Sequence, residues 1–186
     1  PGEAAGLTNN LKSGRDIEIA TASYGQGIAP TPIQTVRARA ALGNGGKMVT
    51  PHIATKINYR LGISRHIGAG GAPRQVLKKE SAEEITRMLV RVVDEALLGG
   101  IHKLEHWSIA AKTGTALIAK QGGGGYHTDR FFHSFFGYFP AYEPRFIIFL
   151  FLNEPQGVVF ASHTLTEPFM ELAKFLINYY EIPPDR

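Results

Sequence analysis

The chain has 186 residues, of which 44% are apolar, so it is long enough for one domain or a large part of one. It carries 20 Lys or Arg against 16 Asp or Glu residues and has no cysteine, which excludes disulfides, cysteine-ligated zinc and thiol catalysis. The basic residues form no run of five, which favours an ordinary basic surface over one that binds nucleic acid. Composition alone leaves an anionic polymer or a membrane surface open as a partner.

The first third of the sequence predicts one clear helix. Residues 1–30 are rich in loop-forming types. Thr31 then suits an N-cap, Pro32 suits the first helical position, and Gln34 completes a capping box. We expect this helix to stop before Gly43, which can adopt a left-handed C-cap.

A second helix is predicted after a glycine-rich stretch, residues 60–75, that is typical of a flexible connection. Ser81 opens this helix with Glu84 as its capping partner, and Gly99 and Gly100 end it. Its apolar residues recur at a spacing of three and four, which predicts one buried face. They are Ile85, Met88, Leu89, Val92, Val93, Ala96 and Leu97.

Three strands and a last helix complete the prediction. The strands are expected over residues 107–118, 131–139 and 146–152, and the short connection between the last two favours an antiparallel pair. The last helix starts near Thr164, with Glu167 as its capping partner. Strands grouped together between helices predict an α+β fold in which helices pack on an antiparallel sheet.

The strand expected over residues 146–152 is apolar at every position. Such a strand is buried on both faces and needs a neighbour on each side. With only three strands in the chain, one side of it is left unpaired, and a long apolar edge promotes aggregation. We therefore expect further strands outside these residues, or another chain, to cover this edge.

One pattern resembles a metal site. The segment HKLEH, residues 102–106, fits the H-x-x-E-H pattern of some zinc proteases, which requires both histidines on one face of a helix. Gly99 and Gly100 precede it and a strand follows at once, so a helix hardly fits there. We therefore expect no metal site.

The segment AKTGTA places unusual residues inside a strand. Side chains alternate along a strand, so Lys112 and Gly114 share one face, while Thr113 and Thr115 share the other. An exposed strand with a solvated lysine would explain the lysine and the threonines. It would not explain Gly114, because a glycine inside a strand often marks the close approach of a ligand or another backbone. An edge strand with a cation and hydroxyls suits an extended peptide that ends in a carboxylate.

The same segment resembles the K-T-G strand of penicillin-binding proteins and serine β-lactamases. Upstream, class B penicillin-binding proteins have a segment similar to ATASYGQGIAPTPIQTVRARAALGNGGKMVTPHI. Downstream, HSFFGYFPAYEPRFIIFLFLNEPQG and PFMELAKFLINYYEIPPD resemble the stretch that follows their K-T-G strand and their C-terminal helix. These two segments favour the septal, cell-division branch over the cell-elongation branch. The resemblance covers nearly the whole chain, and residues 55–105 are its least diagnostic part.

The chain departs from that family in one respect. The family's nucleophile lies in an S-x-x-K motif and its second motif is S-x-N, but no serine in this chain has Lys at +3 or Asn at +2. Both motifs lie upstream of the segment that this chain matches. The resemblance implies that residues 1–186 are the C-terminal part of a transpeptidase domain, with about three of its five core strands, and that this fragment alone is inactive. The family's other two strands pair beside the strand that matches residues 146–152.

The resemblance implies a peptidoglycan DD-transpeptidase that acts on D-Ala-D-Ala stem peptides, is inhibited by β-lactams, works with cell-division proteins and needs no cofactor. Lys112 would supply positive potential for the substrate carboxylate and assist proton movement. The hydroxyls of Thr113 and Thr115 would bind that carboxylate, and the backbone N–H of Thr115 would be one oxyanion-hole donor. Gly114 would keep the inner face of the strand clear for the ligand.

Other readings stay open. Tyr126 and His127, in the glycine-rich loop after the strand, line the cleft or belong to a solvated loop. The complete protein is expected on the outer, periplasmic face of the cytoplasmic membrane, held by an N-terminal helix outside this chain. One alternative function is a non-catalytic binding or sensor module with the same cleft. A weaker alternative is a β-lactamase or a DD-carboxypeptidase.

Overall fold

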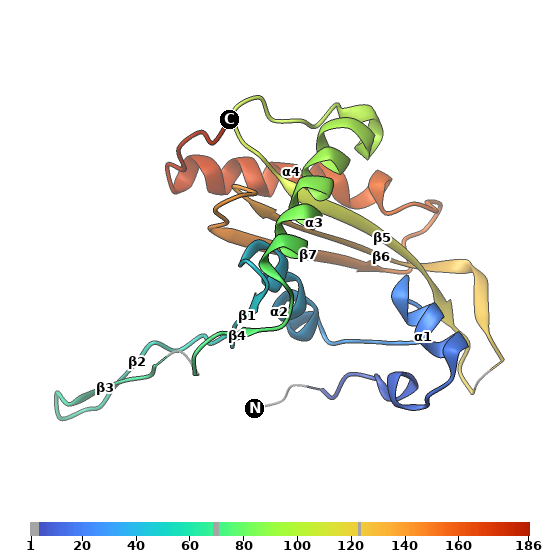
Figure 1. Cartoon of the computed structure of the whole chain (residues 1–186), viewed down its shortest axis with the longest axis horizontal. Helices are drawn as coiled ribbons and strands as arrows, with labels where there is room; N and C mark the ends of the chain where they lie inside the picture. The colour runs from blue at the N-terminus through green and yellow to red at the C-terminus, as the bar shows by residue number, and fades with distance from the viewer. Residues whose placement is uncertain (1–3, 69–70, 123) are drawn as a thin grey trace.

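The sheet at the centre of the molecule has helices on both faces (Figure 1). The computed structural model describes residues 4–68, 71–122 and 124–186. The remaining positions belong to the N-terminal loop and to the two glycine-rich stretches named above, and those parts of the expectations lie outside the described residues. Within the described part, no helix combines the length and hydrophobicity of a membrane span.

The central sheet consists of β5 (Ala110–Ala119), β6 (Tyr126–Phe139) and β7 (Phe146–Asn153) in the order β5-β6-β7, all antiparallel. The outer sides of β5 and β7 have no partner strand among the described residues. The prediction that the apolar strand of residues 146–152 lies at an unpaired edge is confirmed, and so is the α+β arrangement.

Two strand boundaries differ from the prediction. β6 begins at Tyr126, five residues earlier than expected, and β5 begins at Ala110 instead of residue 107. Trp107 and Ser108, which precede this strand, are instead hydrogen-bonded to the C-terminal tail, residues 182–186. The backbone N–H of Ser108 donates to Asp185 Oδ1 at 2.7 Å, and the Ser108 hydroxyl donates to the same carboxylate. The indole of Trp107 donates to the carbonyl of Ile182 at 3.0 Å.

One face of the sheet packs against α4 (Ser162–Tyr179). Phe135 and Phe169 stack with ring centroids 4.4 Å apart, and both are fully buried. Gly137 lets the helix approach, because a Cβ there would lie 2.5 Å from Phe169 Cζ. The helix begins two residues before Thr164, and its N-cap Ala161 makes no side-chain capping bond, so the predicted capping box is wrong.

The other face packs against α2 (Pro32–Gly43) and α3 (Lys79–Arg91). The capping box of α2 is confirmed. Its C-cap is not, because Gly43 is the last helical residue and has no positive φ. A Cβ on Gly43 would lie 2.9 Å from Pro144, so close packing requires this glycine. Gly45 and Gly46 take the left-handed conformation instead.

The boundaries of α3 also differ from the prediction. This helix begins at Lys79, after the N-cap Lys78, which makes no side-chain capping bond, so the expected box at Ser81 does not form. It continues through a π-helical turn, Val92–Ala96, and a 3-10 turn, Leu97–Gly100. Leu89 of the predicted apolar face is buried and packs with Tyr138 of β6. Val90, which was not predicted, is buried beside it, and the prediction is wrong for Met88, which is 55% exposed.

Smaller elements lie in the N-terminal stretch and between α2 and α3. They are the 3-10 helix η1 (Asn9–Lys12), α1 (Asp16–Ser23), the pair β1 (Lys47–Met48) and β4 (Arg74–Gln75), and the pair β2 (Lys56–Asn58) and β3 (Ser64–His66). The hairpin of β2 and β3 projects away from the sheet (Figure 1), so the stretch described as a flexible connection contains paired strands.

Candidate active site

The K-T-G segment lies on β5, an edge strand of the central sheet. Ala110 packs with the α3 side and Ala111 with the α4 side, so the alternation of side chains continues along the segment as expected. The edge that faces away from β6 has no partner strand in the described part of the chain. Such an edge can bind an extended peptide through backbone hydrogen bonds.

Lys112 places an exposed ammonium group on this strand. Its Nζ donates to the backbone carbonyl of Thr113 at 2.9 Å. Among residues 4–68, 71–122 and 124–186, no carboxylate forms an ion pair with Lys112. The positive charge is therefore available to an anion that binds beside the strand.

Thr115 is held by a residue from outside the sheet. Its Oγ1 accepts a hydrogen bond of 3.0 Å from the backbone N–H of Ala161, directly before α4. A hydroxyl has one proton to donate and two lone pairs that accept. Because Ala161 uses a lone pair, the proton of Thr115 can still be donated to a ligand carboxylate.

Gly114 has a different immediate neighbour from the one the sequence suggested. A Cβ on this residue would lie 2.6 Å from the hydroxyl oxygen of Ser134, its cross-strand partner on β6. The space that we assigned to a ligand is therefore bordered by a side chain of this chain. Ser134 Oγ also lies 3.5 Å from the Gly114 carbonyl, so the bare glycine permits close packing within the sheet.

Tyr126 lies at the far end of the β5–β6 pair, opposite Ala119. Ala119 is four residues beyond Thr115, a distance of about 13 Å along the strand. The Tyr126 hydroxyl accepts a hydrogen bond of 3.1 Å from the backbone N–H of Gly27. This contact ties the Y-G-Q-G loop to the sheet.

His127 is next to a charged pair. Its Nε2 lies 3.3 Å from Arg130 Nη1, and Arg130 forms a two-pronged contact with Glu154, with distances of 2.7 and 2.5 Å. The hydrogen bonds from Arg130 hold the pKa of Glu154 below its ordinary value. The structure thus places His127 beside an ion pair and does not bring it to Lys112.

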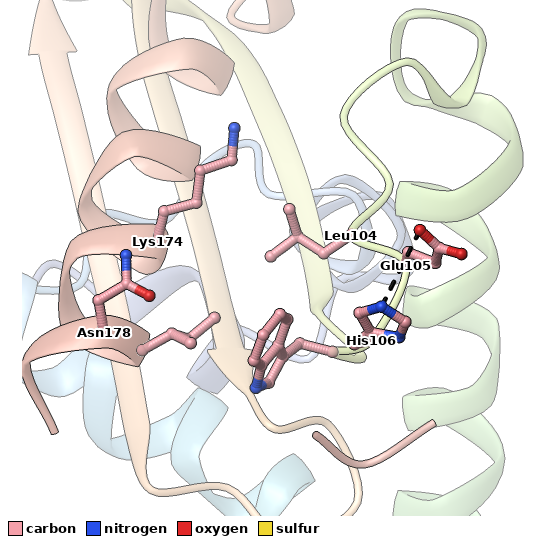
Figure 2. A pocket seen from close by; sticks show the side chains of 7 residues that line it. Leu104, Glu105, His106, Lys174 and Asn178 are labelled. Atoms are coloured by element: carbon pink, nitrogen blue, oxygen red, sulfur yellow. Dashed lines mark ion pairs between the residues drawn. The ribbon is translucent and has the colours of Figure 1, made fainter. Parts of the chain in front are cut away.

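The candidate site lies on an edge strand, apart from the two best-formed pockets of the described residues. A pocket of about 280 Å³ lies between α4 and the loop before β5 (Figure 2). Its lining residues are Leu104, Glu105, His106, Trp107, Lys174, Ile177 and Asn178. None of the K-T-G residues borders this pocket or the smaller one between α2 and β7. Residues 102–106 form a turn and coil, so the two histidines of the HKLEH pattern do not share a helix.

Sequence reasoning missed two groups near the site. Ala161 and the buried His133 both contact the segment around Thr115, but neither belongs to the K-T-G motif. The signal that could have found His133 is a histidine at a core position of an otherwise aromatic strand, since a buried polar side chain requires partners.

Comparison with known proteins identifies the family. The family described as "Penicillin binding protein transpeptidase domain" matches residues 1–172. Stage V sporulation protein D of Bacillus subtilis is 32% identical over 168 residues, which are 90% of this chain and 26% of that protein. The probable peptidoglycan D,D-transpeptidase PenA of Neisseria meningitidis is 27% identical over 187 residues, covering 100% of this chain and 30% of that protein. The chain therefore spans less than a third of these two relatives.

Solved structures agree with this assignment. Penicillin-binding protein 3 of Mycobacterium tuberculosis superposes with a TM-score of 0.87 at 25% identity, over 100% of this chain and 43% of that one. The transpeptidase domain of penicillin-binding protein 3 from Burkholderia pseudomallei gives 0.75 at 27% identity, over 100% of this chain and 53% of that one. The predicted fold is confirmed, and the chain belongs to the penicillin-binding protein transpeptidase domain family.

Proposed function

We propose that this chain is the C-terminal part of a serine DD-transpeptidase that cross-links peptidoglycan during cell division. In this proposal the chain supplies the K-T-G wall of the active site, and the serine nucleophile lies outside these 186 residues. The observation that carries the proposal is the edge of β5, where the described residues provide neither a partner strand nor an ion-pair partner for the ammonium of Lys112. A cation and hydroxyls on a free strand edge match a peptide that ends in a carboxylate.

The reaction proceeds in two steps in this proposal. The serine oxygen attacks the carbonyl between the two terminal D-Ala residues, the terminal D-Ala leaves with a proton on its amine, and an acyl-enzyme forms. An amine from a neighbouring stem peptide then attacks the ester, which releases the serine and forms the cross-link. Lys112 attracts the carboxylate and supports proton movement near the serine.

The threonines and the glycine complete the wall. The hydroxyls of Thr113 and Thr115 donate to the substrate carboxylate, and the backbone N–H of Thr115 stabilises the oxyanion together with the serine's own N–H. Gly114 allows the substrate backbone to approach the strand on the side where Ser134 also lies. Tyr126 and His127 border the outer end of the cleft.

Names of relatives support the wider assignment. Several related proteins are named peptidoglycan D,D-transpeptidases, including FtsI of Buchnera aphidicola, and this favours a transpeptidase over a β-lactamase or a carboxypeptidase. The Mycobacterium tuberculosis neighbour has been solved in complex with aztreonam and with ampicillin. We infer that the complete protein binds β-lactams, acts with cell-division proteins and works on the outer face of the cytoplasmic membrane.

The test is covalent labelling of the full-length protein with a fluorescent penicillin, followed by peptide mapping. We expect one adduct, on a serine outside residues 1–186, and no adduct on the isolated segment. A full-length protein that does not label contradicts the enzyme and favours a non-catalytic module with the same cleft. An adduct on one of the serines of this segment contradicts the assignment of the nucleophile.

A further inference from the structure

His133 is a fully buried histidine in the middle of β6. Both of its ring nitrogens contact residues 159–164, which we call the connecting segment and which comprise the last residues before α4 and the start of that helix. Nε2 lies 2.9 Å from the carbonyl oxygen of Val159, and Nδ1 lies 2.9 Å from the hydroxyl of Thr164. A carbonyl oxygen only accepts, so Nε2 carries a proton and donates it to Val159.

The connecting segment depends on these polar contacts. Two of its apolar side chains are largely exposed, with Val159 at 48% and Phe160 at 62% of their full accessibility. The Thr164 hydroxyl also lies 3.2 Å from the carbonyl oxygen of Ala161, so this side chain contacts the backbone of the segment. His133 therefore binds both ends of a turn whose centre is Ala161.

The centre of that turn contacts the proposed active site. Ala161 is fully buried, and its backbone N–H donates to Thr115 Oγ1 at 3.0 Å. Thr115 is also the cross-strand partner of His133, so the histidine, the turn and the threonine lie together on one face of the sheet. A hydroxyl that accepts a hydrogen bond has a fixed orientation, and the hydroxyl's own proton becomes a stronger donor.

We propose that His133 is a positioning residue for substrate binding. It holds the connecting segment against the sheet, so that the Ala161 N–H keeps the Thr115 hydroxyl directed at the carboxylate of the ligand. This inference rests on the proposed function, because it assigns the Thr115 hydroxyl to that carboxylate. Without the imidazole the segment loses both anchors, and the Thr115 hydroxyl can rotate away from the ligand.

The test measures how fast a penicillin acylates the full-length protein at several penicillin concentrations. These rates give the dissociation constant of the ligand and, separately, the rate constant of the acylation step. His133→Phe removes both ring nitrogens while keeping an apolar side chain that fills the site. We expect it to weaken ligand binding by about 10- to 100-fold, the range for loss of a hydrogen bond to a charged group. The acylation step itself should change much less. His133→Gln keeps one donor for Val159 and should restore most of the binding.

A double-mutant cycle distinguishes a positioning role of His133 from a loss of ligand binding that does not act through Thr115. If His133 acts through Thr115, the pair His133→Phe and Thr115→Val binds no more weakly than Thr115→Val alone. Phe169→Leu serves as a control, because it weakens the packing of α4 on Phe135 and removes none of the hydrogen bonds of His133, Thr164 or Ala161, and its folded fraction should bind the ligand normally. If His133→Phe does not fold, the same cycle is measured with Thr164→Val.

Each result has one meaning. Normal ligand binding by His133→Phe, or losses that add fully in the cycle, overturns the positioning role while the proposed function stands. Normal ligand binding by Thr115→Val contradicts both the proposed site and the inference that depends on it. A full-length protein that is never acylated contradicts the proposed function first.

Discussion

Replacing Gly137 with alanine inserts a methyl group between the sheet and α4. The new Cβ would lie 2.5 Å from Phe169 Cζ and 2.8 Å from Ala111 Cβ, far inside the ~3.5–4.0 Å of a normal carbon contact. Both neighbours are fully buried, so neither can move into solvent. Ala111 lies directly opposite Gly137 on β5, so the close contacts of the new methyl group can be relieved only if β6 or α4 shifts.

Overpacking of a dense core costs roughly 1–3 kcal/mol. For a domain of this size, a loss of about 2 kcal/mol corresponds to a Tm lower by about 4–8 °C. Thermal and urea unfolding of Gly137→Ala measure the loss. Gly68→Ala is the matched control, since a Cβ there meets no atom within 4 Å and no left-handed backbone is involved.

The origin of the loss can be tested with a second substitution. Leucine at position 169 lacks the ring atom that the new methyl group meets, so Gly137→Ala should cost less in a Phe169→Leu background than in the wild type. Two results would refute the reasoning. One is a Gly137→Ala variant as stable as Gly68→Ala, and the other is an equal cost in both backgrounds.

Two further predictions concern polar contacts. Because the hydrogen bonds from Arg130 depress the pKa of Glu154, its carboxylate stabilises the fold above its unfolded-state pKa, and this contribution disappears as the pH falls through the depressed value. The stability gap between wild type and Glu154→Gln, measured by urea unfolding, should therefore shrink in acid, and a gap that widens would contradict the ion pair's role. Ser108→Ala removes the hydroxyl that donates to Asp185 and accepts from the backbone N–H of Ala141, and it should cost about 1–3 kcal/mol in thermal unfolding. The exposed Ser64→Ala should cost almost nothing, and equal losses would show that the two contacts of the Ser108 hydroxyl are unimportant.

Parts of the fold were predictable because their signal is local. The capping box at Thr31 and the apolar face of the second helix lie within a few residues of each other in the sequence. In contrast, α1 was missed because none of its residues is buried, so it has no apolar periodicity to detect. The hairpin of β2 and β3 was missed for a similar reason, since its short strands are exposed throughout.

The candidate site, too, was predictable from the sequence only where its residues are neighbours in the chain. Lys112 to Thr115 are contiguous and were found as a motif, whereas the groups that hold them come from distant parts of the chain. Ala161 lies 46 residues beyond Thr115, and His133 reaches Thr164 across 31 residues. The start of β5 was placed too early because the C-terminal tail competes for Ser108, which no local pattern reveals.

The most direct test of the proposed active site is the acylation rate of two lysine variants in the full-length protein. Lys112 lies within β5 and Lys120 directly follows that strand; both are exposed, but only Lys112 belongs to the K-T-G segment. We predict that Lys112→Ala lowers the second-order rate constant for penicillin acylation by about 10²–10³-fold, as removal of one preorganised electrostatic group typically does. Lys120→Ala should react like the wild type. Equal acylation rates for the two variants would contradict the assignment of β5 as the wall of the active site.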